Sequence, residues 1–376
     1  MRIAVNTRLL LPGKMEGIGW FACETLKRIT KDNPGHEFLF IFDRPWSDEF
    51  IFSGNVTPIE VKPPARHPLL WYTWFEYSLP GVMKRWGADL FLSPDGYVSL
   101  SSDTPSVAVI HDINFMHHPE FHPFLTREYY RRFFPRFASR AVRIVTVSDY
   151  SRNDIIETFG VSPDKVDVVH NGAGDAFYPL NGEDKGAVIN EITGGSDFFL
   201  FVGSFHRRKN ITGLLRAYEL FRKRTGSDIK LVLAGEKMYG YPEMRRTISR
   251  MSFGHDIIFA GYKEPSRLRM LYGAALGLVY VPLFEGFGIP LLEAMNCDTP
   301  VLASNRTAIP EVAGDAAHMA DPENPLSVAE GMERLATDDN YRRILVERGR
   351  QRRKMFSWDR TARLLWKSVE RAMLEI

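Results

Sequence analysis

The sequence has few cysteines and no long apolar run, and each absence excludes a class of protein. Only Cys23 and Cys297 occur in 376 residues, and their separation fits neither a disulfide framework nor a cysteine metal site. No stretch approaches the ~20 apolar residues that a membrane-spanning helix needs. The net charge of +2 argues against a protein that coats nucleic acid, so we expect no nucleic-acid partner.

The N-terminus also lacks the pattern of a secretory signal. MRIAVNTRLLL is too short an apolar run for that purpose and is typical of a first β-strand. With so few cysteines, we expect a cytoplasmic protein, and peripheral attachment at the inner face of a membrane stays open. A length of 376 residues with 44% apolar content predicts two domains of ~150–200 residues.

Strand-like runs alternate with helical patterns in two successive arrays. The first array covers 1–172 and the second covers 198–357. Between them, residues 173–197 are rich in Gly, Asn, Asp and Ser, and we interpret them as a linker. Two such arrays predict two doubly wound, Rossmann-like α/β domains, in which ligands bind beyond the carboxyl ends of the strands.

The stretch 277–301 combines a buried strand, a tight turn and a helix start. Glu285 stands where the apolar strand run ends, the turn 286–288 reads Gly-Phe-Gly, and Pro290 suits the first turn of a helix. Glu293 follows in that helix. Either glutamate alone is commonly only solvated or complements the helix dipole. Both together around this turn favour a site for an anionic or polyhydroxylated ligand.

A basic cluster, Arg207-Arg208-Lys209, follows the strand that begins at Phe198 and opens a helix. Helix N-terminal amides with Arg and Lys make a strong diphosphate site, although a solvated basic turn is the alternative. The sequence has no Asp-x-Asp pair to hold a divalent cation between phosphates, so we expect no metal. Arg208 and Lys209 would then supply the positive charge that stabilises a leaving diphosphate.

The first array offers weaker candidates. The loop before the first helix contains Gly17-Ile18-Gly19. These residues either form a plain βα turn or let the backbone approach a phosphate of the ligand. We expect that helix to start near Trp20. His111 follows a strong strand at 106–110, where a histidine is well placed for chemistry, although a structural role is equally open.

Two aromatic segments of the first array have more than one interpretation. Residues 66–87 either pack a helix into the core or form an acceptor cleft or membrane-facing surface. The helix near 125–140 interleaves five arginines with aromatic residues. It either packs on the sheet or touches anionic lipid. We expect Pro135 to kink or break this helix.

Glu285 and Glu293, separated by seven residues, resemble the E-x7-E signature of family 4 retaining glycosyltransferases with the GT-B architecture. Flanking sequences at 202–210 and 299–317 resemble the family too, as do shorter N-terminal motifs. The resemblance covers essentially the whole chain. It implies two Rossmann-like domains facing across a cleft, with 1–172 plus the final helix 358–376 binding the acceptor and 198–357 binding the nucleotide-sugar donor.

The resemblance also implies roles for single residues. The catalytic residues would be Arg208, Lys209, Glu285 and His111. The donor-binding residues would be Gly17, Gly19, Gly203, Gly261, Tyr262, Gly286, Phe287, Gly288 and Glu293. Asp298 departs from the family, which commonly has Gly at this helix end, and we expect a shifted turn there without loss of activity.

The implied activity is retaining transfer of a hexose, with mannose preferred, from an NDP-sugar to a saccharide or lipid-linked saccharide acceptor in surface polysaccharide or glycan synthesis. The NDP-sugar is a co-substrate, and no cofactor is expected. The alternative is a catalytically silent subunit that binds a nucleotide-sugar. A GT-B enzyme of other chemistry, such as an epimerase or phosphorylase, is a third option.

Overall fold

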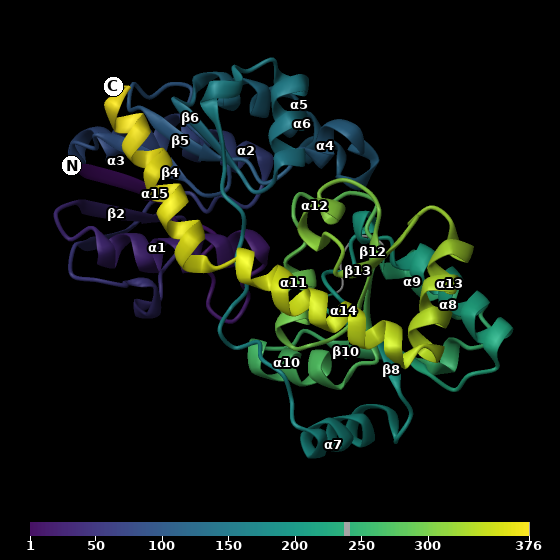
Figure 1. The fold of residues 1–376 in the computed structure, drawn as a ribbon. Coiled ribbons are helices and arrows are strands. Elements are labelled where there is room, and N and C mark those ends of the chain that lie inside the picture. The colour runs from purple at the N-terminus through teal and green to yellow at the C-terminus, as the bar shows by residue number, and fades with distance from the viewer. Residues whose placement is uncertain (237–240, 376) are drawn as a thin grey trace. The chain divides into compact units, whose positions relative to one another are not determined.

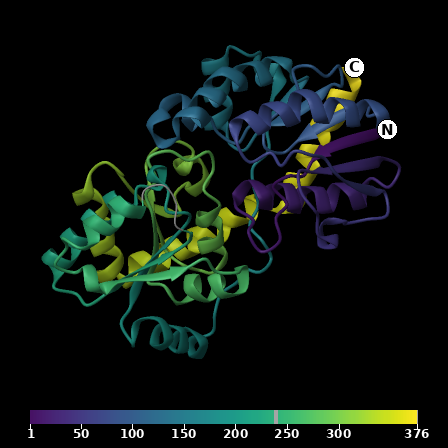
Figure 2. The same ribbon diagram turned by 180° about the vertical axis from the view of Figure 1, so that it is seen from behind.

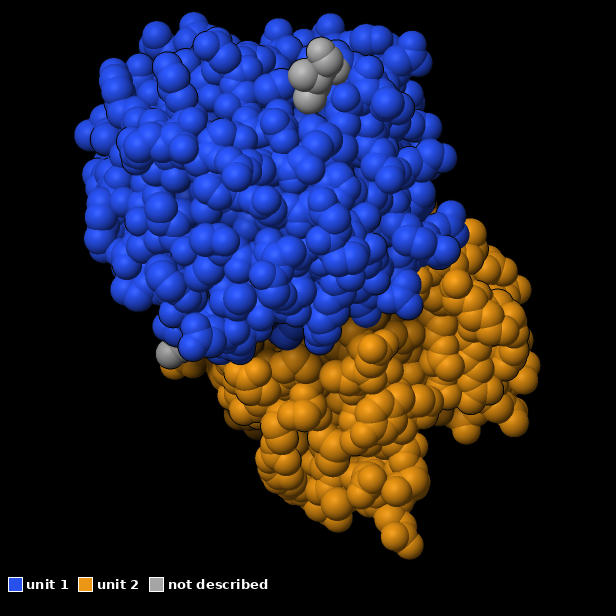
Figure 3. All heavy atoms as spheres, turned by 90° about the vertical axis from the view of Figure 1, so that its left-hand side faces the viewer, with its two compact units in different colours: residues 1–171, 358–376 blue, residues 172–357 orange. Residues whose placement is uncertain are grey.

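The computed structural model describes residues 1–236 and 241–375. The chain divides into two compact units, coloured separately in Figure 3. Unit 1 comprises Met1–Asn171 and Trp358–Ile376, and unit 2 comprises Gly172–Ser357. Each unit is built on a parallel sheet in which strands alternate with helices, which confirms the predicted fold class.

Unit 1 contains a seven-stranded parallel sheet in the order β3-β2-β1-β4-β5-β6-β7. Its strands are β1 Arg2–Asn6, β2 Glu37–Phe42, β3 Val56–Glu60, β4 Leu90–Ser93, β5 Ser106–Val109, β6 Arg143–Thr146 and β7 Val166–Val168. The inner strands β2, β1, β4, β5 and β6 are almost wholly buried because helices cover both faces of the sheet, whereas the edge strands β3 and β7 are only partly buried.

The helices of unit 1 come from both ends of the chain. They are α1 Gly17–Asp32, α2 Pro68–Thr73, α3 Leu79–Trp86, α4 Asn114–His117, α5 Phe124–Arg140, α6 Asp149–Phe159 and α15 Trp358–Leu374. A π-helical segment, Trp74–Ser78, joins α2 to α3. Figure 1 shows α15, in yellow, lying over the sheet of unit 1, where it packs beside α1.

Unit 2 contains a six-stranded parallel sheet in the order β10-β9-β8-β11-β12-β13. Its strands are β8 Phe198–Val202, β9 Lys230–Ala234, β10 Ile257–Gly261, β11 Gly277–Tyr280, β12 Val301–Ser304 and β13 Ala317–Ala320. Its helices are α7 Gly182–Thr193, α8 Ile211–Thr225, α9 Tyr241–Ile248, α10 Pro265–Ala274, α11 Ile289–Asn296, α12 Ile309–Ala313, α13 Pro325–Thr337 and α14 Asp339–Arg352. Figure 2 shows this unit from behind.

The range 173–197, interpreted as a linker, contains a helix instead. The Asn181 side chain caps α7 by accepting a hydrogen bond from the backbone N–H of Asp184, at 2.8 Å. Val188 is buried, and α7 packs against α10 within unit 2. The polar composition of 173–197 did not predict this helix. One capping side chain and one buried side chain are enough for a helix when a neighbouring helix packs against it.

Two helices of unit 1 differ from expectation. Pro135 does not break α5, which continues through it to Arg140, so of the two predicted effects the break is wrong and the kink stays a prediction. The backbone carbonyl that proline leaves without its usual donor belongs to Arg131, an exposed residue. The first helix begins at Gly17 and not near Trp20, so Gly17 and Gly19 both lie in its first turn.

The aromatic segments of unit 1 divide between core and surface. Trp74 and Phe75 are fully buried and pack with Phe137 of α5 on one face of the sheet. By contrast, Leu69 and Tyr77 are 71% and 68% exposed. Core packing therefore applies to some side chains of 66–87 and not to others, and the interpretation of the exposed ones as an acceptor cleft or membrane-facing surface stays a prediction.

Candidate active site

Three charged side chains of unit 2 meet at the carboxyl end of the sheet. Nη1 of Arg208 lies 2.8 Å from Oε2 of Glu285, and Nζ of Lys209 lies 2.5 Å from the same oxygen. Lys209 is buried, with 7% of its surface exposed. The structure thus places a carboxylate between two cations at the edge where ligands of such sheets bind.

The topology explains why residues so far apart in sequence meet. Arg208 and Lys209 lie in a short 3-10 turn after β8, and Glu285 lies after β11, the parallel neighbour of β8. The backbone N–H of Leu283 donates to the carbonyl of Arg208 at 2.9 Å, which joins the two loops. Asn210, whose side chain donates to the carbonyl of Val281, adds a second bond between them.

The two cations decide the charge of Glu285. Burial alone would raise its pKa, but Arg208 and Lys209 outweigh burial and lower the pKa to about 2. The carboxylate is therefore ionised at any physiological pH. It can accept hydrogen bonds from hydroxyl groups while it holds both cations in place.

Tyr280 completes this cluster, and the sequence did not identify it as a site residue. Nζ of Lys209 lies 2.6 Å from its hydroxyl oxygen, and that hydroxyl donates to Glu285 Oε2 at 3.0 Å. Burial, followed by the nearby Glu285 charge, raises the pKa of Tyr280 well above its ordinary value. A phenol within an otherwise aliphatic buried strand was the available signal, because a buried tyrosine hydroxyl needs a partner.

Glu293 lies in a different environment from Glu285. It is the fifth residue of α11, and its Oε2 accepts a hydrogen bond of 2.8 Å from the hydroxyl of Tyr272. Burial raises the pKa of Glu293 to about 7, with the Tyr272 bond opposing the shift. No salt bridge holds Glu293 among the described residues. The two glutamates of the E-x7-E pattern therefore differ in charge behaviour, because only Glu285 has cations beside it.

The turn between these glutamates is shaped by a glycine. Gly288 caps α11 with a φ of 98°, and a Cβ there would lie 2.7 Å from Cδ1 of Ile309. Glycine is therefore needed at this position both for the left-handed backbone conformation and because a side chain would not fit. The ring of Phe287 is buried and packs edge-on against Phe356, so only its backbone can serve a ligand. Gly286 lies in the same turn, before the helix N-terminus.

Thr307 is a second residue that sequence reasoning missed. Its hydroxyl accepts a hydrogen bond of 3.2 Å from the backbone N–H of Glu285, and it adopts a φ of 56°. The backbone N–H of Ala308 bonds the carbonyl of Glu285. The segment after β12 therefore fixes the backbone of Glu285. Nothing in the sequence marks a threonine that adopts a left-handed backbone conformation.

Glycines line the neighbouring strand ends. The backbone N–H of Gly235 donates to the carbonyl of Gly261 at 3.0 Å, and Gly203 donates to Ala234 at 2.9 Å. A Cβ on Gly235 would lie 1.9 Å from the carbonyl oxygen of Gly203, so no side chain fits. Tyr262, after Gly261, is 37% exposed. The predicted residues Gly203, Gly261 and Tyr262 thus lie at one edge of the sheet, where Gly235 joins them.

The remaining predicted residues belong to unit 1. Nε2 of His111 lies 2.8 Å from the carbonyl oxygen of Pro94, and its ring packs edge-on against Phe21. Burial lowers the pKa of His111. A Cβ on Gly19 would lie 2.9 Å from the carbonyl oxygen of Leu9, so the α1 turn needs glycine there for packing. Gly17 begins that helix.

Comparison with known proteins decides the family. The sequence model of "Glycosyltransferase Family 4" matches residues 15–175, and that of "Glycosyl transferases group 1" matches residues 184–352. The O-antigen chain mannosyltransferase B of Escherichia coli is 33% identical over 255 residues, which cover 68% of this chain and 67% of that protein. The chain belongs to the group 1 glycosyl transferases. The predicted resemblance is confirmed, and the protein is a glycosyltransferase enzyme.

Solved structures show the fold of this glycosyltransferase independently. The sucrose-phosphate synthase of Thermosynechococcus elongatus matches with a TM-score of 0.80 at 17% identity, over 100% of both chains. Anabaena HepE, solved in complex with UDP and glucose, matches with a TM-score of 0.77 at 15% identity, over 98% of this chain and 99% of that one. These likenesses support the two-domain GT-B architecture.

No helix of the glycosyltransferase, within residues 1–236 and 241–375, combines the length and apolar character needed to cross a bilayer.

Proposed function

We propose that the protein is a retaining hexosyltransferase that moves mannose from an NDP-sugar to a saccharide or lipid-linked saccharide acceptor in surface polysaccharide synthesis. The observation that carries this proposal is the pairing of Arg208 and Lys209 with Glu285 at the strand ends of unit 2. Cations for a diphosphate and a carboxylate for sugar hydroxyls are what a nucleotide-sugar requires. The mannosyltransferase relative supports mannose and polysaccharide synthesis.

The charges of unit 2 match the charge that develops when a glycosyl bond to a diphosphate breaks. Arg208 and Lys209 would neutralise the departing diphosphate, and the positive end of α11 would add to that field. Glu285 would accept hydrogen bonds from hydroxyls of the transferred sugar. Glu293 would hold the ribose of the nucleotide.

Retention follows in this proposal if the acceptor hydroxyl attacks from the side on which the diphosphate leaves. The departing phosphate oxygen takes the acceptor's proton, so the reaction needs no separate protein base. His111 of unit 1 would contact the sugar near the reacting carbon. Gly17 and Gly19 would approach the phosphates, and unit 1 would bind the acceptor.

We also propose that the reaction needs no metal, because Arg208 and Lys209 supply the charge that a divalent cation provides in other transferases. Transfer should then continue in EDTA at the rate seen with added Mg²⁺. A rate that falls at least tenfold in EDTA and returns with Mg²⁺ or Mn²⁺ would overturn this part of the proposal.

Unit 1 presents a surface that suits a lipid-linked acceptor and peripheral membrane contact. We define the apolar patch as four exposed side chains, Leu69, Leu70, Tyr72 and Tyr77. Tyr72 packs against Phe133 of α5, with ring centroids 5.7 Å apart. The exposed residues of α5 include Arg131, Arg132 and Arg136. Exposed apolar side chains beside arginines favour an anionic membrane surface.

Vesicle flotation tests the membrane part of the proposal. The protein should float with phosphatidylglycerol vesicles and not with phosphatidylcholine vesicles. Leu69→Ser combined with Tyr77→Ser should reduce flotation, whereas Leu326→Ser, at a leucine of unit 2 that is 42% exposed, should not. Equal flotation of all variants, or flotation with neither lipid, would remove the apolar patch from the proposal.

A donor panel tests the activity itself. The protein is incubated with GDP-mannose, UDP-glucose, UDP-galactose and UDP-N-acetylglucosamine, each with a mannose-containing oligosaccharide or lipid-linked acceptor. We expect glycosylated product from a mannosyl donor and little from the others. Binding of a nucleotide-sugar without any product from any acceptor would favour the silent binding subunit.

A further inference from the structure

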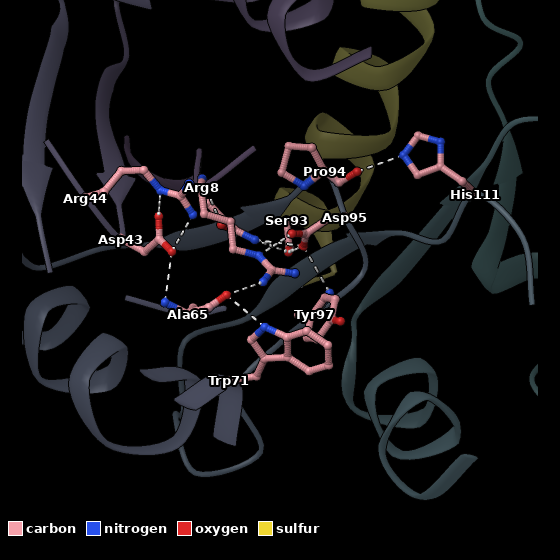
Figure 4. Close-up of polar contacts among 11 residues, drawn as sticks. Arg8, Asp43, Arg44, Ala65, Trp71, Ser93, Pro94, Asp95, Tyr97 and His111 are labelled. Atoms are coloured by element: carbon pink, nitrogen blue, oxygen red, sulfur yellow. Dashed lines mark hydrogen bonds and ion pairs between the residues drawn. The ribbon is translucent and has the colours of Figure 1, made fainter. Parts of the chain in front are cut away.

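A buried ion pair in unit 1 stands outside the roles assigned so far. Nε of Arg8 lies 2.6 Å from Oδ2 of Asp95, and both side chains are more than 90% buried (Figure 4). Arg8 follows β1, and Asp95 follows β4, the parallel neighbour of β1. The pair therefore lies at the carboxyl edge of the unit 1 sheet, the edge at which such folds bind ligands.

The other bonds of Asp95 hold it in one position. Its Oδ1 accepts hydrogen bonds from Nδ2 of Asn6 at 2.7 Å and from the hydroxyl of Ser93 at 3.1 Å. Both carboxylate oxygens are thus used. The guanidinium of Arg8 also donates to the carbonyl of Ala65 at 3.2 Å and lies 4.3 Å from the centre of the Tyr97 ring. Such a network is rigid because breaking any bond leaves a buried polar group unsatisfied.

This network fixes a turn, and the turn lies against the strand that leads to His111. The backbone N–H of Gly96 donates to the carbonyl of Ser93, and Gly96 has a φ of 83°. A Cβ on Gly96 would lie 3.1 Å from the carbonyl oxygen of Val109 and 3.3 Å from Cγ1 of Ile110. The turn 93–96 is therefore packed directly against the end of β5.

The same turn determines which ring nitrogen of His111 carries the proton. Nε2 lies 2.8 Å from the carbonyl oxygen of Pro94, which can only accept a hydrogen bond. Nε2 must then be protonated, and in the neutral ring Nδ1 keeps its lone pair. No group among the described residues bonds Nδ1. Figure 4 shows the Pro94 carbonyl directed at His111 and the Asp95 side chain directed at Arg8.

We propose that Arg8 and Asp95 are positioning residues, which hold the 93–96 turn so that the Pro94 carbonyl keeps His111 as its Nε2–H tautomer with Nδ1 directed to accept a hydrogen bond from a sugar hydroxyl. The effect on turnover rests on the proposed mannosyltransferase function. The effect on the tautomer does not, since it follows from unit 1 alone. A mannosyl donor offers several hydroxyls that a neutral imidazole nitrogen can accept from.

Nitrogen NMR of the full chain labelled with ¹⁵N-histidine tests the tautomer directly. His111 is assigned by the signals lost in His111→Asn. Wild type should show one tautomer, Nε2–H. Asp95→Asn places a donor where Arg8 and Asn6 need an acceptor, so it should give mixed tautomers. We expect kcat to fall roughly tenfold or more, because small displacements at a reacting centre are costly.

Two further variants separate positioning from general destabilisation. Asp256→Asn breaks a similarly buried arginine–aspartate pair in unit 2, with Arg222, and should leave the His111 tautomer and kcat unchanged. Ser93→Ala removes one bond to Asp95 without leaving a charge unpaired, and it should shift the tautomer in the same direction by less. If Asp95→Asn does not fold, Ser93→Ala decides the question.

A wild-type His111 protonated on Nδ1 would overturn the proposal. So would Asp95→Asn and Ser93→Ala proteins that keep the single Nε2–H tautomer and the wild-type kcat. Failure of the mannosyltransferase proposal has a different signature, because wild type would then transfer no mannose while the tautomer still responded to these substitutions.

Discussion

Nζ of Lys209 lies 2.5 Å from Oε2 of Glu285, although the two residues are 76 positions apart in the sequence. The lysine is also bonded to the Tyr280 hydroxyl, and Arg208 contacts the same carboxylate oxygen. The carboxylate offsets part of the positive charge at this strand edge and fixes where the two cations stand. A ligand with a diphosphate would meet charges already in position, which reduces the reorganisation that binding and catalysis require.

Replacing Lys209 should therefore slow sugar transfer more than it weakens donor binding. We expect Lys209→Ala to lower kcat about 10²- to 10³-fold, because a preorganised charge acts most strongly on the charge developed in the transition state. Steady-state transfer assays with a mannosyl donor give kcat and KM separately. Lys223→Ala, at an exposed lysine of α8 paired with Glu219, is the control and should keep wild-type kinetics. If Lys209→Ala kept a near wild-type kcat, the Lys209 side chain would have no role in the reaction.

Glu293 should make stability depend on pH in a direction opposite to that of most carboxylates. Burial raises its pKa to about 7, whereas an unfolded glutamate titrates near about 4.3. The folded state therefore binds the extra proton, so this contribution is fully present below about pH 4.3. It is lost as the pH rises through about 7.

Glu293→Gln should remove that dependence. Relative to wild type, the variant should gain about 3 kcal/mol in free energy of unfolding between pH 4 and pH 8. Guanidinium unfolding at both pH values measures the difference, and Glu333→Gln, at a partly exposed glutamate paired with Arg224, controls for the lost charge. If the two variants changed equally with pH, Glu293 would not be protonated in the folded protein.

The sequence predicted the sheets and the Arg208–Lys209–Glu285 cluster for one physical reason. Buried parallel strands are continuous apolar runs, and the loops after neighbouring strands must meet at one edge of the sheet. The residue patterns at 198–210 and 277–301 therefore predicted both the strands that form there and the charged side chains that follow them. Tyr280 was missed because a phenol in a strand looks like core until its hydroxyl partner is known.

Other features could not be predicted because they depend on tertiary contacts. Helix α7 gains its stability from α10, and α5 continues through Pro135 because its sheet-facing aromatic side chains hold it. Gly203 and Gly235 approach each other closely because the strands before them, β8 and β9, are neighbours in the sheet. Neither local propensity nor periodicity contains that information.

Gly235 should be intolerant of any side chain. Alanine would place Cβ 1.9 Å from the carbonyl oxygen of Gly203 at a φ of 150°, so two strand ends would have to separate. We expect Gly235→Ala to destabilise the protein by about 3 kcal/mol or more, measured by urea unfolding. Gly182→Ala, with open space around it, should change stability by less than about 1 kcal/mol. Equal stability of the two variants would contradict the close approach.

Asp298 ends α11 in a left-handed conformation that the sequence singled out. Its φ is 55°, and its carboxylate lies 2.7 Å from Arg350 and 3.2 Å from Arg353. Asp298→Gly should relieve the cost of the left-handed conformation but lose the ion pairs. The free energy of unfolding should therefore hardly change. Asp298→Ala loses the pairs without that relief and should be about 1 kcal/mol less stable than Asp298→Gly. Thermal unfolding compares them, and an alanine variant as stable as the glycine variant would show that the turn relaxes.

The stereochemistry of the transferred sugar tests the central claim most directly. With an α-linked NDP-mannose donor, the one-bond carbon–hydrogen coupling at the anomeric carbon of the product is measured by NMR, for wild type and for Lys209→Ala. We predict an α-linked mannosyl product from wild type and little product from the variant. A β-linked product, or release of free mannose with no glycosylated acceptor, would contradict retaining transfer.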